Sequence, residues 1–190
     1  MKSEKVPKGG EPFDYFFYFD EDIYLRELRK SDLDGRWPHW LNDPEVTKFT
    51  KGFYPNTRES QELYFESIAN SKTDVVLAIV DRKTGAHLGN VGLHSIDCIH
   101  RTAQFGVMVG EKSAWGRGIG SRVWSLMVEY GFTVLNLHKI TATVLDGNEA
   151  SLKGALKAGF QIEGRQIEQV FKNGSYFDLI QLGMLRKHFK

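Results

Sequence analysis

Residues 111–131 read EKSAWGRGIGSRVWSLMVEYG, and this stretch determines how the rest of the chain is interpreted. It contains GRGIG at 116–120, which follows an apolar run at 105–109 and precedes apolar residues at helical spacing from 123 onward. Glycines let a loop turn tightly and direct bare N–H groups toward one point, and a helix beginning there adds partial positive charge. The pattern predicts a site for an oxyanion, with a pyrophosphate as first candidate; an ordinary strand-to-helix turn is the alternative.

Alternating apolar residues and β-branched runs on both sides of this loop predict seven strands. In chain order they are expected at 23–28, 75–80, 88–96, 103–109, 140–144, 160–171 and 176–185. The second, third and fourth follow one another closely and form an antiparallel meander. Asn173-Gly174 predicts the tight turn of a hairpin that joins the last two strands.

Helical pieces are expected between the first strand and the meander. Ser31 is a candidate N-cap for a first piece, which Pro38 interrupts, and Asp43 caps a short restart. Two more helices are expected later in the chain, one directly after the glycine loop and one that opens at Asn148.

A longer helix is predicted to start at Thr57 and to run to about residue 69, with Leu63, Tyr64 and Ile68 on its buried side. The order of elements predicts an α/β (α+β) fold with a mixed, mostly antiparallel central sheet and helices on both faces. A dinucleotide-binding fold is a poor match, because the glycine loop follows a meander instead of opening an early βαβ unit.

The composition indicates one domain with one site. The 190 residues are divided into an N-terminal tail with an aromatic segment (1–22) and a single domain (23–190). The aromatic run at 13–19 must be covered by the domain or by a second subunit, so a homodimer is left open. Basic and acidic residues number 25 and 24, a balance that argues against a nucleic-acid partner.

Cysteine and histidine usage indicates the compartment and argues against a metal. Cys98 is the only cysteine, the start of the chain does not read as a secretory signal, and no apolar run is long enough to span a bilayer. A cytoplasmic protein without a membrane partner is expected. The six histidines show no short ligand spacing, so no metal is expected.

Several short motifs, taken in order, resemble the GNAT superfamily of N-acetyltransferases. They are WGRGIG at 115–120, YGF at 130–132, LHK at 137–139, NEAS at 148–151, KAGF at 157–160 and NGSY at 173–176. Within that superfamily, the branch of ribosomal-protein alanine acetyltransferases and spermidine acetyltransferases is the most similar, over nearly all of 23–189. The resemblance implies transfer of an acetyl group from acetyl-CoA to a primary amine, by direct attack in a ternary complex.

The acceptor implied by the resemblance is a small molecule or a peptide: a protein N-terminus, a polyamine or an amino sugar. The alternative is a non-catalytic acyl-CoA-binding or interaction module of the same fold. The implied cofactor-binding residues include the glycine loop, the end of the strand before it and the start of the last helix. They are Met108, Val109, Trp115, Gly116, Arg117, Gly118, Ile119, Gly120, Ser121 and Asn148.

In this family two neighbouring strands part and expose backbone amides to the thioester carbonyl; here the strands at 105–109 and 140–144 match that pair. The base that deprotonates the amine is less clear from the sequence. Glu168 is the favoured candidate, with Asp97 and His94 as alternatives.

The proton for the leaving thiolate has one candidate donor. Ala155 occupies the position at which many relatives carry a tyrosine, and Ser151 matches a serine proposed for this role. Either Ser151 serves, or CoA leaves as a thiolate. Gln104 stands where relatives often carry a glutamate.

Acceptor contacts are expected from the early helices and the final hairpin. The candidates are the aromatic residues Trp37, Trp40, Phe53, Tyr54 and Tyr176, most of which could equally be core. Asp43 and Glu45 could attract a cationic amine.

Overall fold

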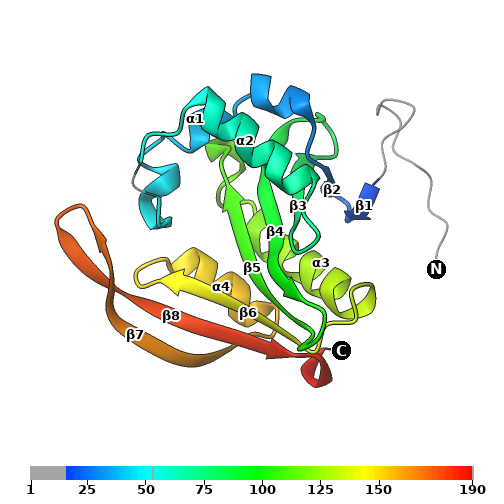
Figure 1. Cartoon of the computed structure of the whole chain (residues 1–190), viewed down its shortest axis with the longest axis vertical. Coiled ribbons are helices and arrows are strands. Elements are labelled where there is room, and N and C mark those ends of the chain that lie inside the picture. The colour runs from blue at the N-terminus through cyan, green and yellow to red at the C-terminus, as the bar shows by residue number, and fades with distance from the viewer. Residues whose placement is uncertain (1–15, 53, 190) are drawn as a thin grey trace.

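The computed structural model describes residues 16–52 and 54–189, which form one eight-stranded sheet (Figure 1). The strand order is β1-β2-β3-β4-β5-β6-β8-β7, and every neighbouring pair is antiparallel except β5 and β6. The strands are β1 (Phe16–Phe19), β2 (Ile23–Glu27), β3 (Val75–Asp81), β4 (His87–Asp97), β5 (Thr102–Val109), β6 (Lys139–Leu145), β7 (Gln161–Lys172) and β8 (Ser175–Leu185).

Helices cover both faces of the sheet. One face is covered by η1 (Lys30–Asp34), α1 (Trp37–Trp40), η2 (Val46–Phe49) and α2 (Arg58–Ala69), and the other by α3 (Ile119–Thr133) and α4 (Glu149–Lys157). Short turns η3 (Lys112–Ala114) and η4 (Arg186–His188) follow β5 and β8. The mixed, mostly antiparallel sheet with helices on both faces confirms the predicted fold class. In the described part of the chain, no helix is long and apolar enough to cross a membrane.

The larger hydrophobic core lies between the sheet and α3. Trp124 of α3 stacks on Phe105 of β5 with ring centroids 3.7 Å apart, and Phe160 meets the same indole edge-on at 4.9 Å. Alternation along β5 divides its side chains between the two faces: Val107 and Val109 pack against this core, whereas Met108 packs with the smaller cluster around α1.

The sheet splits at its middle, between β5 and β6. Their parallel pairing runs from Thr102 opposite Lys139 only as far as Phe105 opposite Ala142. Beyond that point β5 stays paired with β4 and β6 stays paired with β8. The strands therefore part after Phe105, as the comparison with the family predicted.

The final hairpin and the cap of α2 form as expected. Asn173 and Gly174 have φ values of 51° and 82°, the left-handed pair that a tight two-residue turn needs. Thr57 accepts a hydrogen bond from the Ser60 N–H, and Asp43 accepts from the N–H groups of Glu45 and Val46 at the start of η2.

Two local predictions are wrong. Arg29, not Ser31, is the N-cap of η1, because the Asp32 carboxylate accepts the Arg29 N–H and turns the chain there. The predicted buried side of α2 is also partly misplaced: Leu63 is 67% exposed, whereas Gln61 is 3% exposed. Of the predicted face, Tyr64 does line the cavity that this helix covers.

The aromatic segment of the N-terminal tail is partly described. Residues 13–15 lie outside the described residues, and Phe16–Phe19 forms β1, which pairs antiparallel with β2 at the edge of the sheet. The sheet therefore begins before residue 23, where the sequence analysis placed the start of the domain.

Candidate active site

The glycine loop lies at the N-terminus of α3 and leaves open space in front of it. Gly116 and Gly118 have φ values of 74° and 75°, a conformation that L-residues adopt at a cost. A methyl group at Gly116, Gly118 or Gly120 would meet no protein atom within 4 Å. Since nothing inside the described chain requires a glycine at 120, the missing side chain leaves room for something outside the chain.

The helix end behind this loop is available to an anion. Gly118 is the N-cap of α3, and no side chain of the described residues caps that end. The first N–H groups of a helix lack intrahelical partners and carry partial positive charge, which suits a diphosphate. The structure therefore fits the predicted CoA site at the residues from Gly116 to Ser121.

Two contacts fix the loop to the sheet. Trp115 donates from its indole nitrogen to the carbonyl oxygen of Val109 at 2.8 Å, so the loop is tied to the last residue of β5. Ile119 is 2% exposed and anchors the start of α3 in the core. The glycine loop is therefore held at the end of the part of β5 that has left β6.

The side chains of Arg117, one of the implied cofactor-binding residues, and of Arg122 in the first turn of α3 are engaged in ion pairs. Arg117 donates to Asp81 at 2.9 Å, and Arg122 pairs with Asp22. Burial raises the pKa of Asp81, but the hydrogen bonds from Arg117 and from the backbone of the following turn lower it further, and the carboxylate stays charged. Backbone amides, more than these side chains, are available to an anion.

The start of α4 contributes a second helix end near α3. Asn148 caps it by accepting the Ser151 N–H at 3.3 Å, and the Ser151 hydroxyl makes no hydrogen bond to any described residue. A methyl group at Gly154 would lie 3.1 Å from Trp124 and 3.5 Å from the Ser121 hydroxyl, so the glycine lets α4 approach α3 closely. Ser151 and Ser121 thus lie on helices that pack together.

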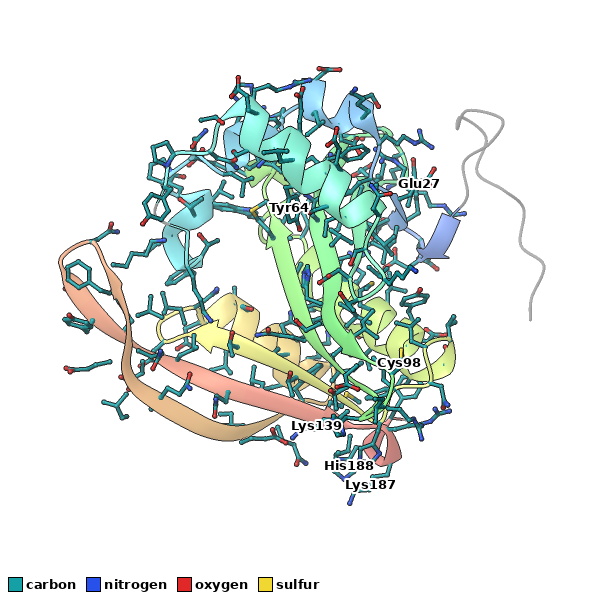
Figure 2. The ribbon with its side chains drawn as sticks, viewed as in Figure 1. Glu27, Tyr64, Cys98, Lys139, Lys187 and His188 are labelled. Atoms are coloured by element: carbon teal, nitrogen blue, oxygen red, sulfur yellow. The ribbon has the colours of Figure 1, made fainter. Side chains whose placement is uncertain are left out.

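A cavity of about 740 Å³ lies on the other face of the sheet, under α2. Tyr64 of α2, labelled in Figure 2, is one of its lining residues. The floor of the cavity is formed by residues of the paired strands β4 and β5. Its lining residues are Trp37, Leu41, Thr50, Lys51, Asn56, Ser60, Gln61, Tyr64, Val76, Asn90, Val91, Gly92, His94, Gly106, Val107 and Met108. Because Gly106 and Met108 belong to the part of β5 that has left β6, this cavity meets the opening in the sheet.

The cavity wall is largely apolar, with several hydrogen-bonding side chains and no carboxylate among its described lining residues. Lys51 is its one lysine or arginine, and His94 is its one histidine. Gln61 is 3% exposed, and its Oε1 atom is buried without a hydrogen-bond partner. A buried carbonyl without a partner is costly, so Gln61 offers an acceptor to a ligand that brings an N–H or O–H group.

His94 is oriented by Asp74. Its Nδ1 lies 3.1 Å from Oδ1 of Asp74, which also accepts the N–H of Ser95. Burial raises the pKa of Asp74, but its hydrogen bonds, with Ser71 the largest contributor, lower it to below the usual range. The ionised carboxylate therefore holds the imidazole in one orientation.

A buried polar network supports the cavity floor. Arg26 grips Asp32 with two hydrogen bonds at 2.7 and 2.8 Å, and His87 lies 3.6 Å from the same carboxylate. With the Asn90 amide oriented to satisfy its neighbours, its nitrogen donates to His87 Nε2 at 2.8 Å and its oxygen accepts from Trp37 at 2.9 Å. The chain of contacts fixes α1 against β4.

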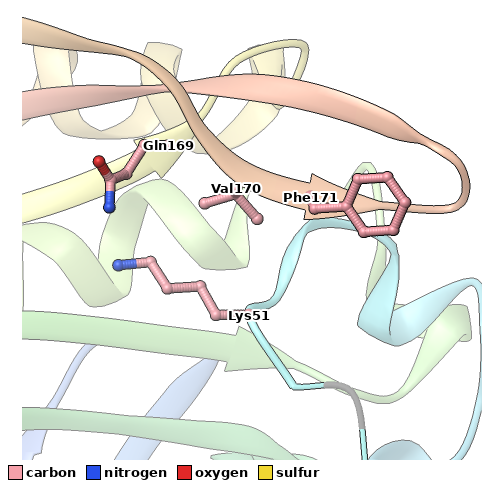
Figure 3. Close-up of a pocket in the computed structure, with 4 residues that line it drawn as sticks. All are labelled: Lys51, Gln169, Val170 and Phe171. Carbon is pink, nitrogen blue, oxygen red and sulfur yellow. The ribbon is translucent and has the colours of Figure 1, made fainter.

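A second, smaller hollow of about 440 Å³ opens between the segment after η2 and β7. It is lined by Lys51, Gln169, Val170 and Phe171, as Figure 3 shows. Lys51 also lines the larger cavity, so its side chain stands between the two. Nearby, Lys172 donates to the carbonyl oxygens of Thr47 and Thr50, both at 2.6 Å, and ties the hairpin to η2.

The structure separates the predicted acceptor residues. Trp37 lines the cavity, whereas Trp40 is 2% exposed and packs directly against Gly110 in the core. Tyr54 and Tyr176 are exposed and do not line the cavity. Phe53 lies outside the described residues.

Two of the three candidate bases lie away from the cavity wall. Glu168 is exposed on an irregular part of β7, with a φ of 48°, and its N–H donates to Asp178. Asp97 accepts the N–H groups of Ile99 and His100, and these bonds lower its pKa. Of the three, only His94 lines the cavity.

Three further residues singled out in the sequence are buried or already paired. Ala155 is fully buried in the core, and the Lys112 ammonium lies 2.8 Å from Asp43 and 3.0 Å from Glu45, so these carboxylates are already paired. Among the described residues, no group of three or more His, Cys, Asp or Glu side chains could hold a metal ion.

The comparison with known proteins agrees with this geometry. Residues 22–161 match the family model of the acetyltransferase (GNAT) domain. An uncharacterised N-acetyltransferase of Bacillus subtilis strain 168 is 32% identical over 162 residues, 82% of this chain and 89% of that protein. The spermidine N(1)-acetyltransferase of Escherichia coli K12 is 30% identical over 169 residues, 88% of each chain.

Solved structures show the same fold. A spermidine N-acetyltransferase from Vibrio cholerae, in complex with CoA and spermine, superposes with a TM-score of 0.82 at 24% identity, over 89% of this chain and 98% of that one. A mutant of spermidine N-acetyltransferase from the same organism gives a TM-score of 0.76 at 26% identity, over 88% and 96%.

The chain belongs to the GNAT acetyltransferase family. It is an acetyl-CoA-dependent N-acetyltransferase that transfers the acetyl group to a primary amine. The family and the activity predicted from the sequence are therefore confirmed, and the alternative of a non-catalytic module is not favoured.

Sequence reasoning missed two residues of the cavity region. Gln61 reads as a surface residue of an amphipathic helix, and only the tertiary structure shows that it faces inward. Asp74 is 20 residues before His94, so no local spacing connects them. Gly92 and Gly106 lie on neighbouring predicted strands and pair with each other. Glycines inside strands indicate a sheet surface that another group can approach closely, so the sequence did carry a signal for this part of the cavity.

Proposed function

We propose that acetyl-CoA binds across the split between β5 and β6, with its diphosphate on the amides from Gly116 to Ser121. The observation that carries this assignment is the junction of three features at the end of β5: the split, the open glycine loop and the cavity. Met108 and Val109 have left β6, so their backbone edge is available to the pantetheine and thioester. Asn148 and Ser151 at the start of α4 would border the same groove.

The acceptor amine would enter the cavity under α2 and approach the thioester from the opposite face of the sheet. Carbonyl activation then comes from backbone N–H groups of the freed part of β5, which are fixed before the substrate arrives. Trp37 and Gln61 would position the amine, and Ser151 would donate a proton toward the departing sulfur. Catalysis of this kind depends mainly on placing both reactants in attack geometry.

A small alkylamine is the proposed acceptor, with polyamines as the first class to test, because a 30% identical relative is named a spermidine N(1)-acetyltransferase. A second class is favoured by the cavity itself. Since its described lining offers hydrogen bonds and no carboxylate, an amine with an uncharged polar tail, such as an amino sugar, suits it as well.

A thiol-release assay tests the proposal. Purified protein with acetyl-CoA is given spermidine, spermine, glucosamine and a peptide with a free N-terminus, each at several ionic strengths. Saturable turnover on at least one amine is expected, and KM should change little with salt if hydrogen bonds dominate recognition. Binding of acetyl-CoA by calorimetry without turnover on any of these amines would contradict the proposal and favour a binding module.

A further inference from the structure

The acetylation step needs a proton acceptor beside the amine. A primary alkylamine has a solution pKa of about 10.4, so it is almost fully protonated at neutral pH and cannot attack until it loses a proton. Among Glu168, Asp97 and His94, only His94 lines the cavity in which the amine would bind.

The imidazole of His94 lies over a bare patch of the sheet. Its Nε2 atom would be only 2.7 Å from a methyl group placed on Gly92 and 3.4 Å from one placed on Gly106. These two glycines pair with each other across β4 and β5. Because neither has a side chain, the Nε2 edge of the ring can lie close to their backbone on the cavity floor.

This patch lies at the apex of the split. Phe105 is the last residue of β5 that pairs with β6, and Gly106 is the next one. The Nε2 atom of His94 is therefore next to the first backbone unit of β5 that is free to meet a thioester. An amine nitrogen between that thioester and Nε2 would have its proton acceptor on one side and its electrophile on the other.

The hydrogen bond to Asp74 fixes which nitrogen acts. With Nδ1 donating to the carboxylate, the neutral ring keeps its lone pair on Nε2, the atom that lies over Gly92 and Gly106. Asp74 is itself held by the Ser71 and Thr73 hydroxyls and by the Ser95 N–H. Such an aspartate orients the ring and stabilises the imidazolium that forms.

Other groups that face His94 do not replace it. Tyr64 of α2 lines the same cavity, and burial, with the charge of Asp74 as a smaller cause, raises its pKa, so it stays a neutral phenol. Lys51 on the far wall is a cation and cannot accept a proton while charged. Gln104, directly opposite His94 on β5, is a neutral amide.

From this geometry we infer that Nε2 of His94 is the general base that deprotonates the acceptor amine, and that Asp74 is its positioning residue. The inference rests on the proposed function of the cavity as the acceptor site.

The reaction consists of a proton transfer from the ammonium group to His94 followed by acetyl transfer from sulfur to nitrogen. One N–H bond of the ammonium breaks and its proton forms an N–H bond on Nε2, which leaves a neutral amine. The amine lone pair attacks the thioester carbonyl, the C–S bond breaks, and a second amine proton leaves with the sulfur to give the thiol. The imidazolium then releases its proton to solvent, so the net products are the amide, CoA and one proton.

A pH series on matched variants tests the assignment. His94→Gln keeps a polar side chain of moderate size, Asp74→Asn keeps the shape of the orienting residue, and His100→Gln, on an exposed loop, is the control. With the best acceptor from the amine panel, His94→Gln should lower kcat/KM about 100- to 1,000-fold at pH 7. Asp74→Asn should give a smaller loss, and His100→Gln none.

The readout that separates catalysis from structure is the pH dependence of the loss. As the pH rises toward the pKa of the amine, solvent supplies the free amine, so the loss in His94→Gln should shrink by at least tenfold between pH 7 and 9.5. Addition of imidazole to His94→Ala should restore part of the rate at pH 7. The affinity for acetyl-CoA should be unchanged in all variants.

Failure of the role of His94 can be distinguished from failure of the proposed function. A His94→Gln loss that stays constant from pH 7 to 9.5, or a variant as active as the unmodified protein, would overturn the role of His94 while the acetyltransferase activity stands. Absence of turnover by the unmodified protein on every amine would overturn the proposed function, and with it this role.

Discussion

The indole nitrogen of Trp115 donates a hydrogen bond to the carbonyl oxygen of Val109 at 2.8 Å. Val109 is the last residue of β5, and Trp115 is the residue directly before the glycine loop. The bond therefore closes a short turn and links the two parts of the proposed CoA site. It holds the loop at a fixed distance from the freed edge of β5.

Trp115→Phe should loosen this link. An aromatic ring is kept, although it is smaller, and the hydrogen bond is lost, which costs about 0.5–1.5 kcal/mol in binding or stability. The Kd for acetyl-CoA, measured by calorimetry, should rise between about twofold and tenfold on the same scale. Tyr54→Phe, which alters an aromatic residue that is 92% exposed, is the matched control and should leave the Kd unchanged. An unaltered Kd in Trp115→Phe would mean that the link does not shape the site.

Gly120→Val should block the donor site without unfolding the protein. The added side chain would meet no protein atom near its first carbon, and Gly120 lies inside the first turn of α3 with ordinary backbone angles. Since the space in front of that turn is where the diphosphate is proposed to lie, acetyl-CoA affinity should fall at least tenfold, while the thermal midpoint changes by only a few degrees. Ser125→Val, at an exposed position of the same helix, controls for the introduction of a β-branched residue into α3.

A normal affinity in Gly120→Val would place the diphosphate elsewhere. Gly118→Val would be a poorer test, because a φ of 75° makes any L-residue there unfavourable by about 1–2 kcal/mol. A loss of binding in that variant could therefore arise from strain in the loop.

Much of the fold followed from local patterns. The meander strands β3, β4 and β5 were predicted to within two residues at each end, because alternating apolar residues and a turn at 82–85 act over short distances. The Asn173-Gly174 turn and the Thr57 cap were equally local. The glycine loop could be predicted because its glycines determine the conformation of the local backbone and do not depend on a distant partner.

The acceptor side was harder to predict, since it depends on which faces meet. Gln61 is buried because α2 covers a cavity, and periodicity instead selected Leu63, which is exposed. Tyr54 and Tyr176 are of a residue type that often lines binding pockets, yet they lie on the surface. No local signal could have assigned these residues, because burial on this face is set by packing between distant elements.

Gln61→Met tests whether the unpaired Oε1 atom serves the acceptor. Methionine has a similar volume and no carbonyl, so the variant removes a buried acceptor without opening a cavity. KM for the acceptor should rise about two- to tenfold, the equivalent of one neutral hydrogen bond. Stability of the free protein should stay equal or increase, because a buried polar atom without a partner is gone.

This opposite movement of binding and stability distinguishes a ligand contact from a structural one. Glu66→Met, at an exposed position of the same helix, is the control and should change neither quantity. If Gln61→Met left KM unchanged while the protein became more stable, Gln61 would be a destabilising buried polar residue that does not contact the amine substrate. Acetyl-CoA affinity should be the same in all three proteins.

The buried network under the cavity predicts a pH-dependent stability that centres on His87. Burial lowers the pKa of His87, against the opposing effects of the Asp32 charge and the Asn90 hydrogen bond, so the folded protein keeps this ring neutral. In the unfolded chain the ring titrates near pH 6.5. Below that pH the unfolded state binds a proton that the folded state does not, so the free energy of unfolding must fall as the pH decreases.

The measurement is the thermal midpoint from pH 8 to pH 5 for the unmodified protein and for His87→Gln, whose amide can still meet Asn90. The unmodified protein should lose stability through this window, and the variant should show a flatter dependence. Asp32 does not interfere: burial raises its pKa, but Arg26 and the Arg29 N–H lower it further, so its contribution is lost only at more acidic pH. Parallel curves for the two proteins would show that His87 is not the group that titrates, and that its ring is protonated as readily in the folded state as in the unfolded chain.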